Sequence, residues 1–101
     1  MNTTTKLLAP LAAAALLTGC GASEYSPSIT TTPAEMFADG CQSCHGEKGT
    51  GKFGLLLRLA GSDESIEHIA EKIEKGGMVM SSFPGINTAQ RLALATYIKT
   101  L

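Results

Sequence analysis

The sequence has no run of Lys or Arg, and its formal net charge is −1, so it offers no basic patch to a nucleic-acid partner. Its apolar run from Leu7 to Leu17 is too short to cross a membrane, which takes about 20 residues. A strand-rich pattern is also missing. These absences leave a chain of 101 residues that holds one domain at most and is not built to bind nucleic acid.

Cysteine and histidine are scarce outside one stretch, residues 41–45, which reads Cys-Gln-Ser-Cys-His. A structural zinc site needs four Cys or His ligands, and elsewhere the sequence offers only Cys20 and His68. A thioredoxin-like redox pair needs a βαβ context that this sequence does not show. The remaining alternative to a cofactor is a chance pentapeptide that holds a plain disulfide.

The pattern Cys-x-x-Cys-His is the attachment signature of a c-type haem. Cys41 and Cys44 are spaced to form thioether bonds with the two vinyl groups on one edge of the ring. His45 follows at once, so its imidazole can bind the iron from one face as the proximal ligand. The sequence therefore predicts one covalent haem c.

The N-terminal residues have the pattern of an export signal. Lys6 precedes the apolar run, and Leu17-Thr18-Gly19-Cys20 resembles the lipobox of bacterial lipoproteins. We expect residues 1–19 to be a signal peptide and Cys20 to carry a lipid, which also accounts for the odd third cysteine. The alternatives are an ordinary secretory signal with a chance cysteine and an uncleaved anchor. The prediction places the protein in a bacterial cell envelope, facing the periplasm.

Residues 20–32 are polar, small and aperiodic, and we interpret them as a lipid-anchored flexible tether. The twelve residues 21–32 would span about 20 Å on average as a coil. Residues 33–101 would then form the folded domain. Without the signal peptide the chain is close to the size, about 70–80 residues, below which a core of side chains alone is marginal. We therefore expect the form without haem to be poorly folded.

Caps and apolar spacing predict three helices, and hence an all-α fold of helices and loops wrapped around the haem. The first begins at Thr32, where Thr32-Pro33-Ala34-Glu35 is a capping box with proline at the first helical position. It runs into the haem motif, and Phe37 lies one turn before Cys41.

Two further helices follow. The second is predicted with Ser62 as N-cap and Gly76 at its end, and its apolar stripe comprises Ile66, Ile69, Ala70 and Ile73. His68 falls on the polar face of this helix, so we expect it to be exposed to solvent and not to bind iron. The third helix begins at Asn87, where Gln90 completes a capping box, and its stripe comprises Leu94, Tyr97, Ile98 and Leu101.

A sixth ligand for the iron is predicted in the loop over residues 76–85. A methionine thioether suits haem iron opposite histidine, and the loop contains Met78 and Met80. In an extended loop both would point the same way, so spacing cannot choose between them. Arg58 has two open readings, a partner for a haem propionate or a solvated side chain.

From about Pro33 to Leu101 the chain resembles a small monohaem class I cytochrome c. The matching stretches are residues 41–46, 57–61, 80–83 and 97–98. In that family a Met-Pro-x-Phe segment supplies the axial methionine, so the resemblance implies Met80 as the ligand, with Met78 as second choice. Ser81 replaces the proline of that segment. Pro33 replaces a helix-crossing glycine.

Leu57 stands where the family has a proline whose carbonyl accepts a hydrogen bond from the axial histidine. We expect that carbonyl to survive the change of residue. Because the hydrogen bond tunes the basicity of the ligand, its presence bears on the behaviour of the iron.

Two functions are compatible with this pattern. The first is a one-electron carrier, not an enzyme, in which His45 and Met80 fill both axial positions. The resemblance implies transient redox partner proteins and, we expect, a monomer held to the membrane through Cys20. The alternative is an open-site haem protein, a gas sensor or a peroxide-handling subunit, which needs a weak or absent sixth ligand.

Overall fold

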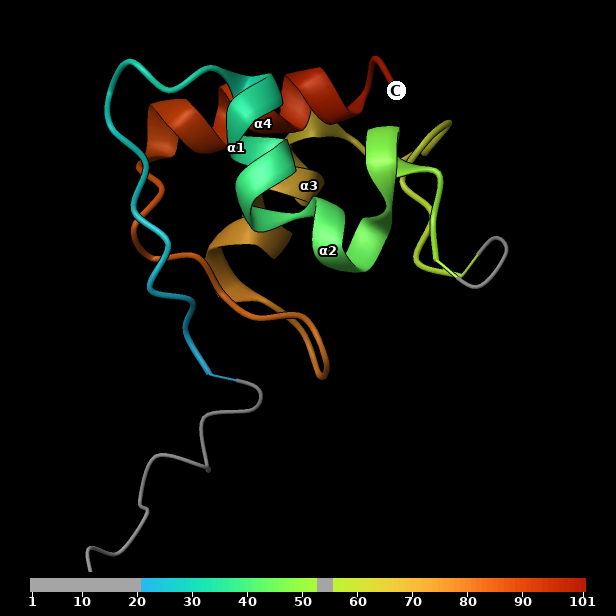
Figure 1. Ribbon diagram of the computed structural model, residues 1–101, viewed down its shortest axis with the longest axis horizontal. Helices are drawn as coiled ribbons and strands as arrows, with labels where there is room; N and C mark the ends of the chain where they lie inside the picture. Colours follow the sequence, from blue (N-terminus) through green and yellow to red (C-terminus); the bar gives the residue numbers. More distant parts are fainter. Residues whose placement is uncertain (1–20, 53–55) are drawn as a thin grey trace, which may run out of the picture.

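The computed structural model describes residues 21–52 and 56–101. Its helices are α1 (Pro33–Gly40), α2 (Gln42–His45), α3 (Ile66–Lys75) and α4 (Thr88–Ile98), with a 3-10 turn, η2, over Glu47–Gly49. The predicted all-α fold is confirmed, with α1, α3 and α4 as the three main helices (Figure 1). The predicted signal peptide and Cys20 lie outside the described residues.

Helix α1 begins as the sequence predicts. The Thr32 hydroxyl accepts from the Glu35 backbone N–H at 3.2 Å, and the Glu35 carboxylate accepts from the Thr32 N–H at 2.9 Å. Proline stands at the first helical position, where its missing N–H leaves no bond unmade. The helix ends where the Cys41 N–H donates to the Phe37 carbonyl, which brings the haem motif directly against the end of α1.

The predicted N-cap of α3 is wrong by three residues. The helix begins at Ile66, and the Ser65 hydroxyl accepts from the His68 N–H at 3.1 Å. Ser62 instead accepts from the N–H of Glu64, two residues on, which is a serine turn that precedes the helix. The end at Gly76 is confirmed, because its N–H donates to the Lys72 carbonyl at 2.8 Å.

Helix α4 packs on both α1 and α3, and its capping box between Asn87 and Gln90 is present as predicted. It crosses α1 where the rings of Phe37 and Tyr97 meet, with centroids 5.9 Å apart. Leu94 and Ala95 on α4 are fully buried. The core contains Met36, Phe37, Cys41, Ile69, Ala70, Ile73, Phe83, Ile86, Leu94, Ala95 and Ile98. Cys41 therefore joins the haem motif to this core.

Residues 21–31 run along the side of the domain toward α1 (Figure 1). Ala22 forms a parallel bridge with Ser82, and the Ser23 N–H donates to the Ser82 carbonyl at 2.7 Å. Further on, the side-chain amide of Gln90 donates to the Ser28 carbonyl. From residue 22 onward the predicted tether is therefore bonded to the domain and is not a free coil. A polar, aperiodic composition does not reveal this, because the bonds come from partners about 60 residues away.

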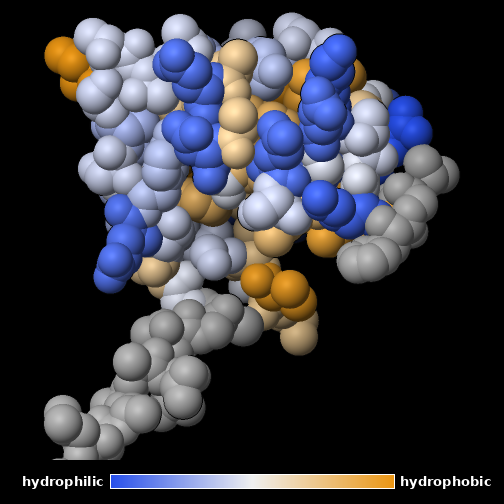
Figure 2. All heavy atoms as spheres, viewed as in Figure 1, coloured by the Kyte–Doolittle hydropathy of each residue, from blue (hydrophilic) through white to orange (hydrophobic). Residues whose placement is uncertain are grey.

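The connection between α3 and α4 contains an exposed apolar turn. The Gly77 N–H donates to the Met80 carbonyl at 2.9 Å, which makes Met78 and Val79 the tip of a tight turn. The two residues are 96% and 81% exposed, respectively. Figure 2 shows a small hydrophobic patch at this end of an otherwise largely hydrophilic face. Among residues 21–52 and 56–101, no helix has the length and apolar character needed to cross a membrane.

Candidate haem site

The two motif cysteines occupy different environments. Cys41 lies between α1 and α2 and is buried, whereas Cys44 on α2 is exposed. Burial, with the nearby Cys44 sulfur adding to the effect, raises the pKa of the Cys41 thiol to about 11. Cys41 thus stays a neutral thiol at neutral pH and forms part of an apolar wall. Both sulfurs lie on the same short segment, as attachment along one edge of a ring requires.

A tight loop after the motif fixes the position of His45. The Gly51 N–H donates to the His45 carbonyl at 2.7 Å, so the chain doubles back directly after α2. Gly46 has φ of +82°, and a Cβ on it would collide with the Gly51 carbonyl. Only glycine can therefore follow the histidine in this loop.

His45 is oriented by a hydrogen bond to the loop opposite. Its Nδ1 lies 2.7 Å from the Leu57 carbonyl oxygen. A carbonyl can only accept, so Nδ1 carries the proton and Nε2 is left with a free lone pair for a metal. The carbonyl that was expected at Leu57 is therefore in place.

The backbone at Leu57 differs from that of a proline. Its φ is +61°, in the left-handed region, whereas a proline ring holds φ near −65°. The two residues can present a carbonyl to the histidine, but they do so from different backbone conformations. The departure from the family pattern at this position is thus a change of loop conformation and not a simple exchange of side chains.

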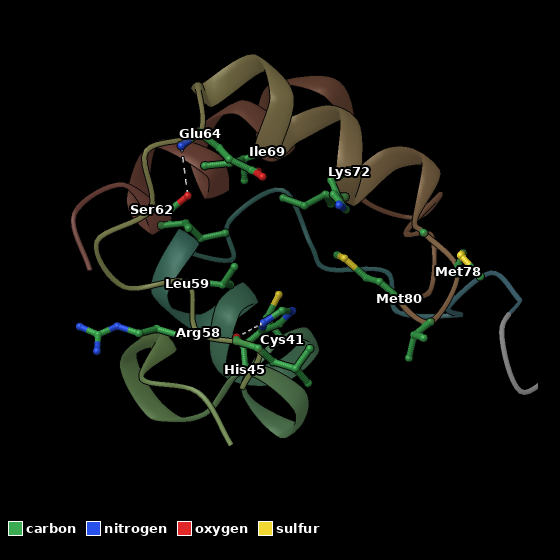
Figure 3. A pocket seen from close by; sticks show the side chains of 15 residues that line it. Cys41, His45, Arg58, Leu59, Ser62, Glu64, Ile69, Lys72, Met78 and Met80 are labelled. Atoms are coloured by element: carbon green, nitrogen blue, oxygen red, sulfur yellow. Dashed lines mark hydrogen bonds between the residues drawn. The ribbon is translucent and has the colours of Figure 1, made fainter. Parts of the chain in front are cut away.

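The structure separates the two methionines that spacing alone left equivalent and of which the family resemblance favours Met80. Met80 is half-buried and points into the cavity toward Cys41 and His45, whereas Met78 lies at the exposed tip of the turn (Figure 3). The expectation that both point the same way is wrong, because the hydrogen bond between Gly77 and Met80 makes a turn and not an extended strand. Of the two thioethers, that of Met80 faces the imidazole across the cavity.

Two adjoining cavities of about 360 and 310 Å³ separate these groups. Both are lined by Cys41, His45, Leu57, Val79 and Met80. The first continues along the apolar side chains of Leu59, Ile69, Ile73 and Ile98, and the second reaches Cys44. Each volume is within the range of about 300–1,000 Å³ typical of ligand pockets. An apolar slot with two thiols at one edge, an imidazole on one side and a thioether on the other fits a haem c.

The charged or polar ends of two other candidates, Arg58 and His68, point away from the slot. The Arg58 Nε donates to the Ala60 carbonyl at 3.1 Å, and its guanidinium points away from the cavity (Figure 3), which favours the solvated reading. The His68 side chain is 57% exposed and lies 3.7 Å from Glu64, on the outer face of α3 as expected. Arg58 therefore lines the first cavity without turning its guanidinium into it, and His68 lines neither cavity.

Several residues around the slot were missed by the sequence reasoning. Lys72 extends from α3 to the mouth of the first cavity (Figure 3). Ser23, Tyr25 and Asp39 line the second cavity. Tyr25 is the one aromatic side chain in an otherwise small and polar segment, and that contrast was the signal available in the sequence.

Comparisons with known proteins agree with this geometry. The family model described as cytochrome c oxidase, cbb3-type, subunit III matches residues 29–98. Cytochrome c-550 of Bacillus subtilis (strain 168) is 38% identical over 61 residues, which are 60% of this chain and 49% of that protein. The chain thus spans about half the length of the curated relative it matches.

Proposed function

Since the chain belongs to the family described as cytochrome c oxidase, cbb3-type, subunit III, we propose that it is a membrane-tethered, periplasmic electron carrier with His/Met-ligated haem c. Domains of the cytochrome c family bind haem c covalently, and membership supports an electron-transfer protein. To what family membership supports, the proposal adds the two iron ligands, the membrane tether and the redox partners.

One observation carries the ligand set: His45 and Met80 face one slot, and the hydrogen bond to Leu57 leaves Nε2 of His45 free. We assign the proximal position to His45 and the sixth position to Met80, with Cys41 and Cys44 as the thioether residues. Haem c supplies one-electron cycling between ferrous and ferric iron. His45 and Met80 would hold the iron from its two sides, which would leave no position open to an external ligand.

The walls of the slot favour the reduced state. Ile69, Ile73 and Phe83 are buried beside it, and an apolar surround penalises the extra positive charge of ferric iron. A methionine ligand raises the reduction potential in the same direction. The hydrogen bond from His45 to Leu57 opposes this, because it makes the imidazole a more basic ligand that favours ferric iron. With haem bound, the protein would set the reduction potential through these three separate contributions.

The exchange of electrons needs only brief contact with other proteins. We propose transient redox partners that meet the monomer, because interfaces of electron-transfer proteins are small. A lipid on Cys20 would raise the local concentration of the domain near donors and acceptors in the membrane. The absence of a basic patch agrees with protein partners and gives no support to nucleic acid.

The test is the far-red absorption spectrum of the ferric holoprotein, with Met80→Ala and Met78→Ala measured alongside. We expect a sulfur-to-iron charge-transfer band that Met80→Ala abolishes and that Met78→Ala, its matched control two residues away, retains. Loss only in Met78→Ala would keep the function and overturn the ligand. Absence of the band in the unmutated protein, with rapid binding of CO to the ferrous form, would favour the open-site alternative.

A further inference from the structure

The loop that carries Met80 has little stiffness of its own. Glycines stand at positions 76, 77 and 85, and Ser81 follows the methionine directly. Within the domain the loop is held on one side, where the Phe83 N–H donates to the Ile73 carbonyl at 2.9 Å. This bond holds the loop only on the side that faces α3, so the opposite side needs a second contact to be held in place.

The N-terminal segment supplies that contact. The Ser23 N–H donates to the Ser82 carbonyl at 2.7 Å, beside the bridge between Ala22 and Ser82. Ser82 is two residues from Met80, so this bond acts almost directly on the proposed ligand. The segment therefore closes the side of the loop that faces away from α3.

Tyr25 joins the segment to both the loop and α1. Its hydroxyl donates to the Asp39 carboxylate at 3.1 Å. Its ring lies so close to Gly40 that a Cβ there would be 3.3 Å away, and the same added atom would lie 3.4 Å from Phe83. Its carbonyl lies so close to Gly85 that no side chain fits there. One residue thus connects the loop to the helix that precedes the haem motif.

We propose that residues 22–28 are a strap that holds the Met80 loop against the haem slot, with Tyr25 as its positioning residue. The strap lines the same cavity as His45 and Met80 through Ser23 and Tyr25, and Asp39 on α1, which accepts the Tyr25 hydrogen bond, lines it as well. It supplies the restraint that a proline after the methionine would otherwise give. The inference rests on the proposed His45/Met80 ligation and adds the group that keeps the sixth position filled.

The strap is tested by CO binding to the ferrous holoprotein, because CO can enter only when Met80 leaves the iron. Tyr25→Ala removes the ring and the hydroxyl, and we expect CO to bind about tenfold faster, since apparent binding scales with the open fraction. Tyr25→Phe removes only the bond to Asp39, so a smaller increase is expected. Glu24→Ala, which changes an exposed neighbour in the same segment, leaves the rate unchanged.

A second control distinguishes the proposed positioning role of Tyr25 from a general contribution to the stability of the fold. Ser65→Ala weakens the cap of α3 away from the loop, so it lowers thermal stability without raising the CO rate. If Tyr25→Ala does not incorporate haem, Tyr25→Phe and Ser23→Pro decide the question, the latter because proline has no N–H to donate to Ser82. CO rates in the strap variants equal to that of Glu24→Ala would overturn the strap while leaving Met80 ligation intact. An unmutated protein without the far-red band would instead overturn the proposed function itself.

Discussion

At the scale of single residues, two adjacent glycines after α3 differ in what they permit. Gly76 has φ of +70°, and a Cβ on it would lie 2.7 Å from the Met80 carbonyl oxygen and 2.8 Å from the Ser82 nitrogen. At Gly77 the nearest atom would be the flexible Lys72 Cε, 3.8 Å away. A side chain at Gly76 would therefore collide with the Met80 loop, whereas one at Gly77 would not.

We predict that Gly76→Ala destabilises the holoprotein by about 1–3 kcal/mol, because the left-handed backbone and the collision both oppose a side chain. The far-red band should weaken as the loop shifts. Gly77→Ala is the matched control, expected to change stability by no more than about 0.5 kcal/mol. Denaturant unfolding and the ferric spectrum of both variants check the prediction, and equal effects at the two positions would contradict it.

A second residue-scale prediction concerns pH. Burial, with the bond to Asp39 and the charges of Asp39, Cys41 and Glu35 adding, raises the pKa of Tyr25 to about 12 from its model-compound value of 10.0. The folded state favours the neutral phenol, so this contribution to stability is complete below pH 10 and is lost as pH rises toward 12. Haem attached at Cys41, as proposed, would remove the Cys41 charge, which is one of the smaller causes of this raised pKa, and would leave burial and the Asp39 bond.

The free energy of unfolding of the holoprotein should therefore fall between pH 10 and 12 with an extra slope that Tyr25→Phe lacks. Chemical denaturation of both proteins at several pH values across this window measures the difference. Parallel pH profiles for the two would show that the phenol does not titrate with folding.

At the scale of elements, α3 provides a direct test of how its start is fixed. Ser65→Ala should cost about 1 kcal/mol, because it removes the acceptor for the His68 N–H. Ser62→Ala leaves the helix cap intact and should cost clearly less. Urea unfolding of the two holoprotein variants compares them, and a larger loss at Ser62 would restore the start that the sequence suggested.

How far each element could be predicted follows from where its partners lie. The starts of α1 and α4 can be predicted from the sequence, because both halves of a capping box lie within four residues. The start of α3 is not, because Ser62 and Ser65 both precede the apolar stripe and only backbone geometry selects one. The candidate haem-binding residues Cys41, Cys44 and His45 can be predicted for the same reason, because all three lie within five consecutive residues.

The parts of the site that escaped prediction depend on distant or conformational partners. Met78 and Met80 are equivalent by spacing, and only the turn closed by Gly77 distinguishes them. The contact of Ser23 with Ser82 joins residues far apart in sequence, so composition described the segment as a tether. Family resemblance placed a carbonyl at Leu57 correctly, but it could not show the left-handed backbone there.

At the scale of the whole molecule, the haem slot is also the space between the helices. Its walls include Ile69, Ile73 and Ile98, which are buried core residues on one side and slot lining on the other. Without haem these side chains would border an apolar cavity, and an unfilled cavity lowers the free energy of unfolding. A domain of this size has a small free energy of unfolding to begin with.

We predict that the protein with Cys41→Ala and Cys44→Ala, which lacks haem, is poorly folded. Thermal unfolding followed by circular dichroism should show no cooperative transition, and amide resonances should be poorly dispersed. Cys20→Ser keeps both attachment residues and should unfold cooperatively. A cooperative transition with well-dispersed resonances in the double variant would show that the helices fold without the cofactor.

Ala22 and Ser23 are bonded to Ser82, and with the proposed lipid on Cys20 these bonds would limit the distance between the domain and a membrane. Only Gly21 lies between Cys20 and Ala22, and the two steps of chain from Cys20 to Ala22 span at most about 7 Å when extended. A lipid on Cys20 would therefore hold the edge that carries Met80 close to the bilayer surface. The domain would pivot about that edge within a narrow shell, and would not sweep the wider volume open to a flexible arm of about 20 Å. Electron donors and acceptors would then have to present their own redox centres within that shell, low above the lipid headgroups.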